Sequence, residues 1–122
     1  HKPTHIDGHH HTHKLPQTVE AKKRLAEKYG MKYIREVESE VAFIPDFYGP
    51  NTNFDQFKKV LERHKDAAYV ELMCHVALID VDLVQCSTYN FDRVHELETL
   101  IGSQAKAYIA ELKIELTNFA SY

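Results

Sequence analysis

Apolar side chains recur along this chain at two spacings, which predict helices that alternate with strands. Apolar residues three or four positions apart share one face of a helix, and this spacing predicts helices over 15–29, 53–64, 91–101 and 105–112. Short apolar runs predict strands over 3–7, 31–37, 67–74 and 114–116. The segments 38–52 and 80–88 follow neither spacing, so we expect irregular loops there.

Residues with strong preferences for helix ends support these boundaries. Pro16 suits a first helical position, and Gly30 suits the position just after a helix. Asn53 is a typical N-cap, with Gln56 at the spacing of a capping box, and Asn90 is the expected cap of the third helix.

The predicted order of elements indicates the fold class. Strands that alternate with helices are typical of parallel βα units with right-handed crossovers. About four mostly parallel strands are predicted, which are too few to close a barrel. We therefore expect a single α/β domain over residues 1–122.

The most unusual stretch runs from His5 to His13 and holds five of the nine histidines, together with Asp7. If this stretch is an extended strand, its alternate residues share one face. That face would carry His5, Asp7, His9, His11 and His13. Neutral imidazoles are common metal ligands, so the pattern predicts a metal site. The alternatives are a purification tag and a solvated histidine-rich loop.

Three further residues are candidates for a functional site. His75 follows an apolar run and should lie at the carboxyl end of a strand, where ligands gather in parallel βα proteins. It could act as a general acid, or it could be a core histidine bonded to the backbone. Arg35 could reach this edge or form an ordinary ion pair. Tyr48 lies in an aromatic loop that could pack on the core or cover a substrate.

Composition narrows the class of partner. The chain of 122 residues is 43% hydrophobic and has a formal net charge of −3, with no basic run that would bind nucleic acid. No apolar stretch has the length of a membrane span. Cys74 and Cys86 form no CxxC motif and are expected to be reduced thiols, which favours a cytoplasmic location.

Two blocks of sequence resemble a known family. The first runs Pro3-Thr4-His5-Ile6-Asp7-Gly8-His9-His10-His11-Thr12-His13-Lys14-Leu15-Pro16. The second is Glu71-Leu72-Met73-Cys74-His75, followed by Asp80, Ser87-Thr88-Tyr89, Arg93, Glu96-Leu97 and Leu100, and the shorter Phe47-Tyr48-Gly49 also matches. Together they resemble the YdjC-like carbohydrate deacetylases, a family that includes chitooligosaccharide deacetylases.

The resemblance implies a metal-dependent enzyme that removes N-acetyl groups from acetylated amino sugars, built on a deformed βα barrel. In such enzymes an aspartate and two histidines hold the metal, Mg²⁺ or Zn²⁺ being the expected ions. Only His9 carries over to this chain. The aspartate and the general base belong to an Ala-Asp-Asp-Phe-Gly block, which this sequence does not contain. His75 matches the general acid, although the residue after it is Val76 where the family usually has proline.

The resemblance covers one part of such an enzyme, so it also predicts supporting residues and the behaviour of the chain alone. Asp7, His11, His13, Arg35 and Tyr48 would support the ligands or contact the substrate. As the C-terminal part of a barrel, the chain should be inactive alone and should associate with itself, because its strand edges are exposed. The alternative is a non-catalytic module that binds metal or sugar.

Overall fold

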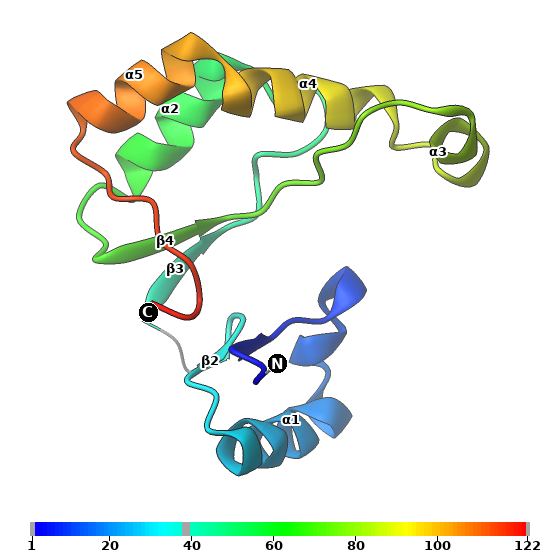
Figure 1. The fold of residues 1–122 in the computed structure, drawn as a ribbon, viewed down its shortest axis with the longest axis vertical. Helices are drawn as coiled ribbons and strands as arrows, with labels where there is room; N and C mark the ends of the chain where they lie inside the picture. The colour runs from blue at the N-terminus through cyan, green and yellow to red at the C-terminus, as the bar shows by residue number, and fades with distance from the viewer. Residues whose placement is uncertain (1, 38–39, 122) are drawn as a thin grey trace. The chain divides into compact units, whose positions relative to one another are not determined.

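The computed structural model describes residues 2–37 and 40–121 of the chain, which is drawn in Figure 1. The chain divides into two compact units. Unit 1 comprises His1–Val41 and Leu116–Tyr122, and unit 2 comprises Ala42–Glu115. No helix in the described ranges is both long and apolar enough to cross a membrane.

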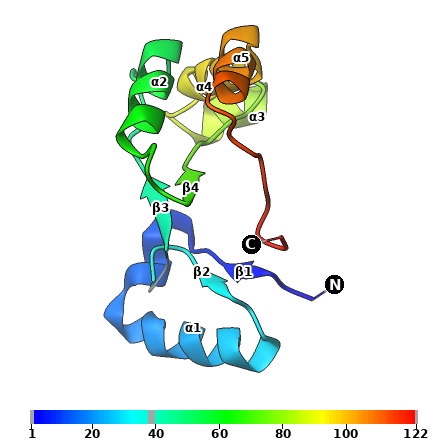
Figure 2. The ribbon, with the colours of Figure 1, turned by 90° about the vertical axis from the view of Figure 1, so that its left-hand side faces the viewer.

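Unit 1 is built on a βαβ arrangement. Strands β1 (His5–Ile6) and β2 (Tyr33–Ile34) pair in parallel, with His5 opposite Tyr33. They are connected by the 3-10 helix η1 (His9–Lys14) and the helix α1 (Pro16–Tyr29), which lies beside both strands (Figure 2). Phe119 stacks on Tyr33 and on His5, with ring centroids 5.0 Å and 4.0 Å apart. The predicted parallel βα unit is therefore present.

Helix α1 begins and ends where the sequence predicts. Pro16 is its first residue, and Gly30 closes it in the left-handed conformation (φ 61°), with its amide bonded to carbonyls of the last turn. The flanking strands are shorter than predicted. Strand β2 ends at Ile34 because Val37 donates to the Ile34 carbonyl, at 3.1 Å, and Glu36 has a positive φ of 55°. The chain turns there instead of continuing as a strand.

Unit 2 packs helices around an aromatic core. Strands β3 (Val41–Ile44) and β4 (Tyr69–Leu72) form a second two-stranded sheet. The helices are α2 (Phe54–Arg63), α3 (Val81–Cys86), α4 (Phe91–Ile101) and α5 (Ser103–Glu111). The core cluster consists of Phe47, Phe57, Leu61, Ala105 and Tyr108. Figure 1 shows α2, α4 and α5 gathered together.

The predicted caps of these helices are present, with one difference. Asn53 Oδ1 accepts a hydrogen bond from the Gln56 amide at 3.0 Å, and Asn90 Oδ1 accepts from the Phe91 amide at 2.6 Å. The Gln56 side chain does not complete the capping box, because its Nε2 donates to the Asp46 carbonyl at 3.4 Å.

Three predicted segments are wrong. Strand β3 lies within 38–52, where neighbouring prolines and glycines hid a run of four apolar residues. Helix α3 lies within 80–88, and Asp80 caps it by accepting from the Leu83 amide at 2.8 Å. The segment 114–116 is not a strand, because Lys113 takes a positive φ of 56° and Ile114 donates back to the Ile109 carbonyl at 3.0 Å. This is the usual closure of a helix C-terminus.

Candidate functional site

The histidine-rich stretch is not an extended strand, so the predicted shared face is wrong. Strand β1 ends at Ile6, and His9–Lys14 form η1. His10 and His11 have left-handed backbone conformations, with φ of 52° and 56°. Left-handed residues other than glycine are uncommon, and their strain often lies at functional sites. The five side chains therefore do not share one face of a strand.

Gly8 allows this turn to close tightly. Its φ of −131° is ordinary, so the turn does not need glycine for backbone freedom. A Cβ on Gly8 would instead lie 2.6 Å from both the His13 backbone nitrogen and Thr12 Oγ1. The Gly8 nitrogen also lies 3.0 Å from His13 Nδ1, and the Gly8 carbonyl lies 3.2 Å from it. Gly8 thus holds one edge of the His13 ring.

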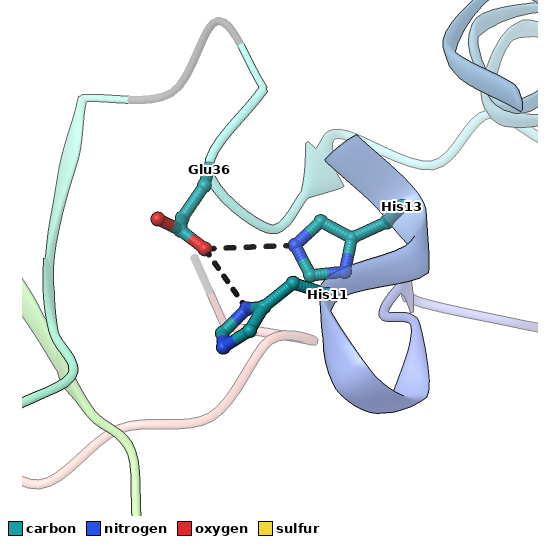
Figure 3. A group of neighbouring side chains, drawn as sticks. All are labelled: His11, His13 and Glu36. Carbon is teal, nitrogen blue, oxygen red and sulfur yellow. Dashed lines mark ion pairs between the residues drawn. The ribbon is translucent and has the colours of Figure 1, made fainter. Parts of the chain in front are cut away.

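The other edge of that ring faces a carboxylate. His13 Nε2 lies 3.6 Å from Glu36 Oε2, and His11 Nδ1 lies 3.3 Å from the same oxygen (Figure 3). One nitrogen or oxygen atom from each of these residues lies within 4.8 Å of the others. We call this group the His11–His13–Glu36 cluster. It combines η1 with the turn after β2, two segments that the parallel pairing of β1 and β2 brings together.

Two members of the cluster are shielded from solvent and partly unsatisfied, whereas the His11 side chain is 43% exposed. The His13 side chain has no exposed surface, and that of Glu36 is 19% exposed. Within the described part of the chain, His13 Nε2 and Glu36 Oε2 are buried and have no hydrogen-bond partner. Buried polar atoms normally have a partner, so this pair points to a proton or a cation that both can share.

Neighbouring side chains lower the pKa of Glu36. Burial raises the pKa of Glu36, but the hydrogen bond and charge of Lys14 and the charges of His11 and His13 together hold it below its usual value. Lys14 Nζ donates to Glu36 Oε1 at 2.9 Å, which leaves Oε2 for the histidines. Two imidazole nitrogens and a carboxylate oxygen form a donor set typical of Zn²⁺, so these residues fit a divalent cation.

Asp7 and Arg35 form an ion pair beside the cluster. Arg35 NH1 donates to Asp7 Oδ2 at 2.7 Å, which is one of the two roles that the sequence left open for this arginine. Asp7 Oδ1 lies 3.5 Å from His13 Nδ1 and accepts from the Gly8 amide at 2.6 Å. Asp7 therefore supports the His13 side chain.

His9 does not join the three clustered residues. It is exposed, and its ring lies edge-on to that of His10, with centroids 4.2 Å apart. Its assignment as a metal ligand stays a prediction. Glu36, in contrast, was not among the predicted site residues. Its position two residues after a strand paired in parallel with β1 was the signal that could have identified it.

His75 lies in unit 2, three positions after the end of β4, and its ring lies beside a pair of stacked tyrosines. Tyr48 and Tyr89 stack with centroids 4.4 Å apart and an interplanar angle of 8°. The His75 ring lies edge-on to both, at 5.3 Å and 5.7 Å. His75 remains 32% exposed, so its ring is held in place but accessible. Its role as general acid stays a prediction.

Comparisons with known proteins identify the family of this chain. A profile of the YdjC-like protein family matches residues 1–111. A carbohydrate deacetylase of Geobacillus stearothermophilus is 37% identical over 98% of this chain and 52% of its own length. A chitooligosaccharide deacetylase of Salmonella paratyphi B is 32% identical over 90% of this chain and 49% of its own length.

The fold has a counterpart among solved structures. A crystal structure from Enterococcus faecalis V583, of a protein named for cellobiose-phosphate cleavage, superposes with a TM-score of 0.82 at 26% identity. It is matched over 98% of this chain and 52% of its own. The chain thus spans about half the length of the relatives it matches. Because the family profile covers nearly all of its residues, the chain belongs to the YdjC-like protein family.

Proposed function

We propose that this chain is part of a metal-dependent carbohydrate deacetylase that removes N-acetyl groups from amino sugars such as chitooligosaccharides. The names of the two relatives support the reaction and the class of substrate. Their greater length supports the view that other residues complete a deformed βα barrel around the site.

The observation that carries the metal dependence is the His11–His13–Glu36 cluster, where two buried polar atoms converge without a hydrogen-bond partner in the described ranges. These three residues would hold the ion, together with His9, the ligand that the family resemblance implies, which is exposed in η1. When bound, a divalent ion such as Mg²⁺ or Zn²⁺ supplies Lewis acidity and lowers the pKa of water. Asp7 would maintain the orientation of His13 through its contact with Nδ1.

His75 would serve as the general acid. Hydrolysis of the acetamide breaks its C–N bond, and the departing amine nitrogen must take up a proton. His75 Nδ1 faces Glu96 Oε1 at 3.9 Å, so Nε2 is the atom that would deliver the proton. Tyr48 stacks on Tyr89 beside this ring and is 46% exposed, so its exposed part can contact a sugar.

The proposal is tested by hydrolysis of diacetylchitobiose in the presence of Mg²⁺ or Zn²⁺. We expect no turnover by the 122-residue chain alone, because the family's base and aspartate ligand are not in its sequence. Fusion to the part of the Geobacillus stearothermophilus relative that this chain does not match should restore turnover. His9→Ala and His75→Ala should abolish it in the fusion, while His95→Ala, at an exposed position of α4, should not.

Each arm of that experiment can contradict one part of the proposal. Turnover by the chain alone would show that the additional residues are not required. A folded fusion that binds metal but releases no acetate would favour a non-catalytic metal- or sugar-binding module.

We also propose that the chain alone associates with itself. Several large apolar side chains are strongly exposed, among them Leu78 (78%), Val81 (68%), Phe91 (65%) and Leu116 (79%). Exposed apolar side chains are typical of surfaces that bind another chain when they form a contiguous patch. Light scattering should report a mass above 14.2 kDa, and a uniform monomer would contradict the proposal.

A further inference from the structure

We infer that Glu96 is the positioning residue of His75. The Glu96 carboxylate anchors the main chain of His75 and also lies near its imidazole ring. This inference rests on the proposed role of His75 as general acid. Glu96 lies on α4, and it is one of three buried polar or charged side chains in the described part of the molecule.

Burial of Glu96 is complete, and both of its carboxylate oxygens are used. Glu96 Oε2 accepts a hydrogen bond from the His75 amide, and Oε1 accepts one from the Tyr89 hydroxyl. Removing a carboxylate from water is unfavourable unless hydrogen bonds compensate. A surface position on the same helix avoids this cost, as Glu98 shows with a side chain that is 81% exposed. The buried carboxylate is therefore best explained by the groups it holds.

Arg93 holds the same peptide from its other side. Its NH1 donates to the His75 carbonyl at 2.9 Å, and its Nε donates to the Tyr89 carbonyl at 2.7 Å. Arg93 and Glu96 are three positions apart and so share one face of α4. Between them they bind the amide and the carbonyl of His75, which fixes its main chain to the helix.

Tyr89 extends this contact to the aromatic loop. Its hydroxyl donates to Glu96 and accepts from the Gly49 amide at 2.9 Å, next to Tyr48. Burial and the hydrogen bond to Glu96 raise the pKa of Tyr89, so it keeps its proton at working pH. Glu96 thereby positions His75 directly and Tyr48 through Tyr89.

The charge of Glu96 also suits a general acid. A carboxylate near an imidazole favours the protonated form, which is the form that an acid requires. Arg93 opposes this effect, and the rings of Tyr48 and Tyr89 are neutral. Glu96, Arg93, Tyr48 and Tyr89 are the charged or titratable side chains that the contacts above place at His75. Loss of the Glu96 charge should therefore lower the pKa of His75.

The test is a titration of the His75 ring by NMR in the 122-residue chain, which requires no activity. Glu96→Gln should lower the pKa of His75 by about one unit, because a neighbouring opposite charge is lost. The matched control is Glu98→Gln, which removes an exposed charge from the same helix and should leave that pKa unchanged. Equal titration in the two variants would overturn the inference.

A second variant separates the charge from the main-chain contact. Glu96→Asp keeps the charge but is too short to hold both partners, so it should speed hydrogen exchange of the His75 amide about tenfold or more. Unchanged exchange would show that the carboxylate does not anchor the peptide. This measurement also remains decisive if Glu96→Gln fails to fold, as judged by circular dichroism.

In the active fusion, Glu96→Gln should reduce kcat more than it changes KM. It should also move the alkaline limb of the pH profile to lower pH, because the acid would lose its proton earlier. An unchanged profile would contradict the inference. If the fusion has no activity although the NMR shift is present, the proposed function fails and the contact between Glu96 and His75 stands.

Discussion

Glu36 Oε2 lies 3.6 Å from Nε2 of His13, a histidine with no exposed side-chain surface. The two residues come from opposite ends of a βαβ unit, and the parallel pairing of β1 with β2 brings them together. The far edge of the His13 ring is held by Gly8 and Asp7. Because the imidazole cannot turn away without losing these contacts, its Nε2 is directed at the carboxylate.

This relationship predicts a cation site in the isolated chain. Titration with Co²⁺ or Zn²⁺, followed by absorption or calorimetry, should detect binding. Glu36→Gln and His13→Ala should each weaken it by at least about tenfold, since each removes a donor atom. His95→Ala provides the control, because this histidine lies outside the cluster. Equal affinity in all variants would exclude the cluster as the binding site.

The lowered pKa of Glu36 predicts how stability depends on pH. A carboxyl group whose pKa is lower in the folded than in the unfolded chain stabilises the fold at higher pH. That stabilisation is present above its usual value of 4.5 and is lost as the pH falls through the folded-state pKa. Urea unfolding between about pH 6 and about pH 3 should show this loss in the wild type. Glu36→Gln should show a smaller dependence, and an identical one would contradict the assignment.

The ion pair between Asp7 and Arg35 predicts a moderate contribution to stability. Their side chains are 36% and 20% exposed, so solvent screens the pair only in part. Asp7→Asn should reduce the free energy of unfolding by about 1 kcal/mol. The control is Asp46→Asn, which removes the partner of Arg63 in a more exposed pair and should cost less, about 0.5 kcal/mol. The reverse order would show that exposure does not decide these contributions.

The close approach at Gly8 predicts that a methyl group there displaces η1. Gly8→Ala should destabilise the fold by roughly 1–3 kcal/mol, the usual cost of overpacking, and weaken cation binding. Gly49→Ala is the comparison, because its φ is 67° and no atom lies within 4 Å of the added Cβ. It should cost about 1 kcal/mol through backbone strain alone and leave cation binding unchanged. Unchanged cation binding in Gly8→Ala would show that the close approach at Gly8 is not needed to form the cation site.

Local signals in the sequence predicted the helices well. Pro16, Gly30, Asn53 and Asn90 act within one or two turns of the residues that they cap, so their effect is visible without the rest of the fold. Strand β3 and helix α3 were missed, because short elements depend on pairing and packing with distant residues. The segment 114–116 was also predicted wrongly. Its apolar residues predict a strand, but the closure of the preceding helix determines its conformation.

For the site, the sequence by itself determined the family, the histidine-rich stretch and the position of His75, because these are properties of residue type and spacing. Only the tertiary structure decided which side chains meet. The left-handed turn at His10 and His11 removed the five-residue face, and parallel strand pairing brought Glu36 to His11 and His13. Helix α4 likewise directs Glu96 at the His75 amide. Such contacts join residues far apart in the chain, and the energy that selects them comes from packing and burial, which local spacing does not encode.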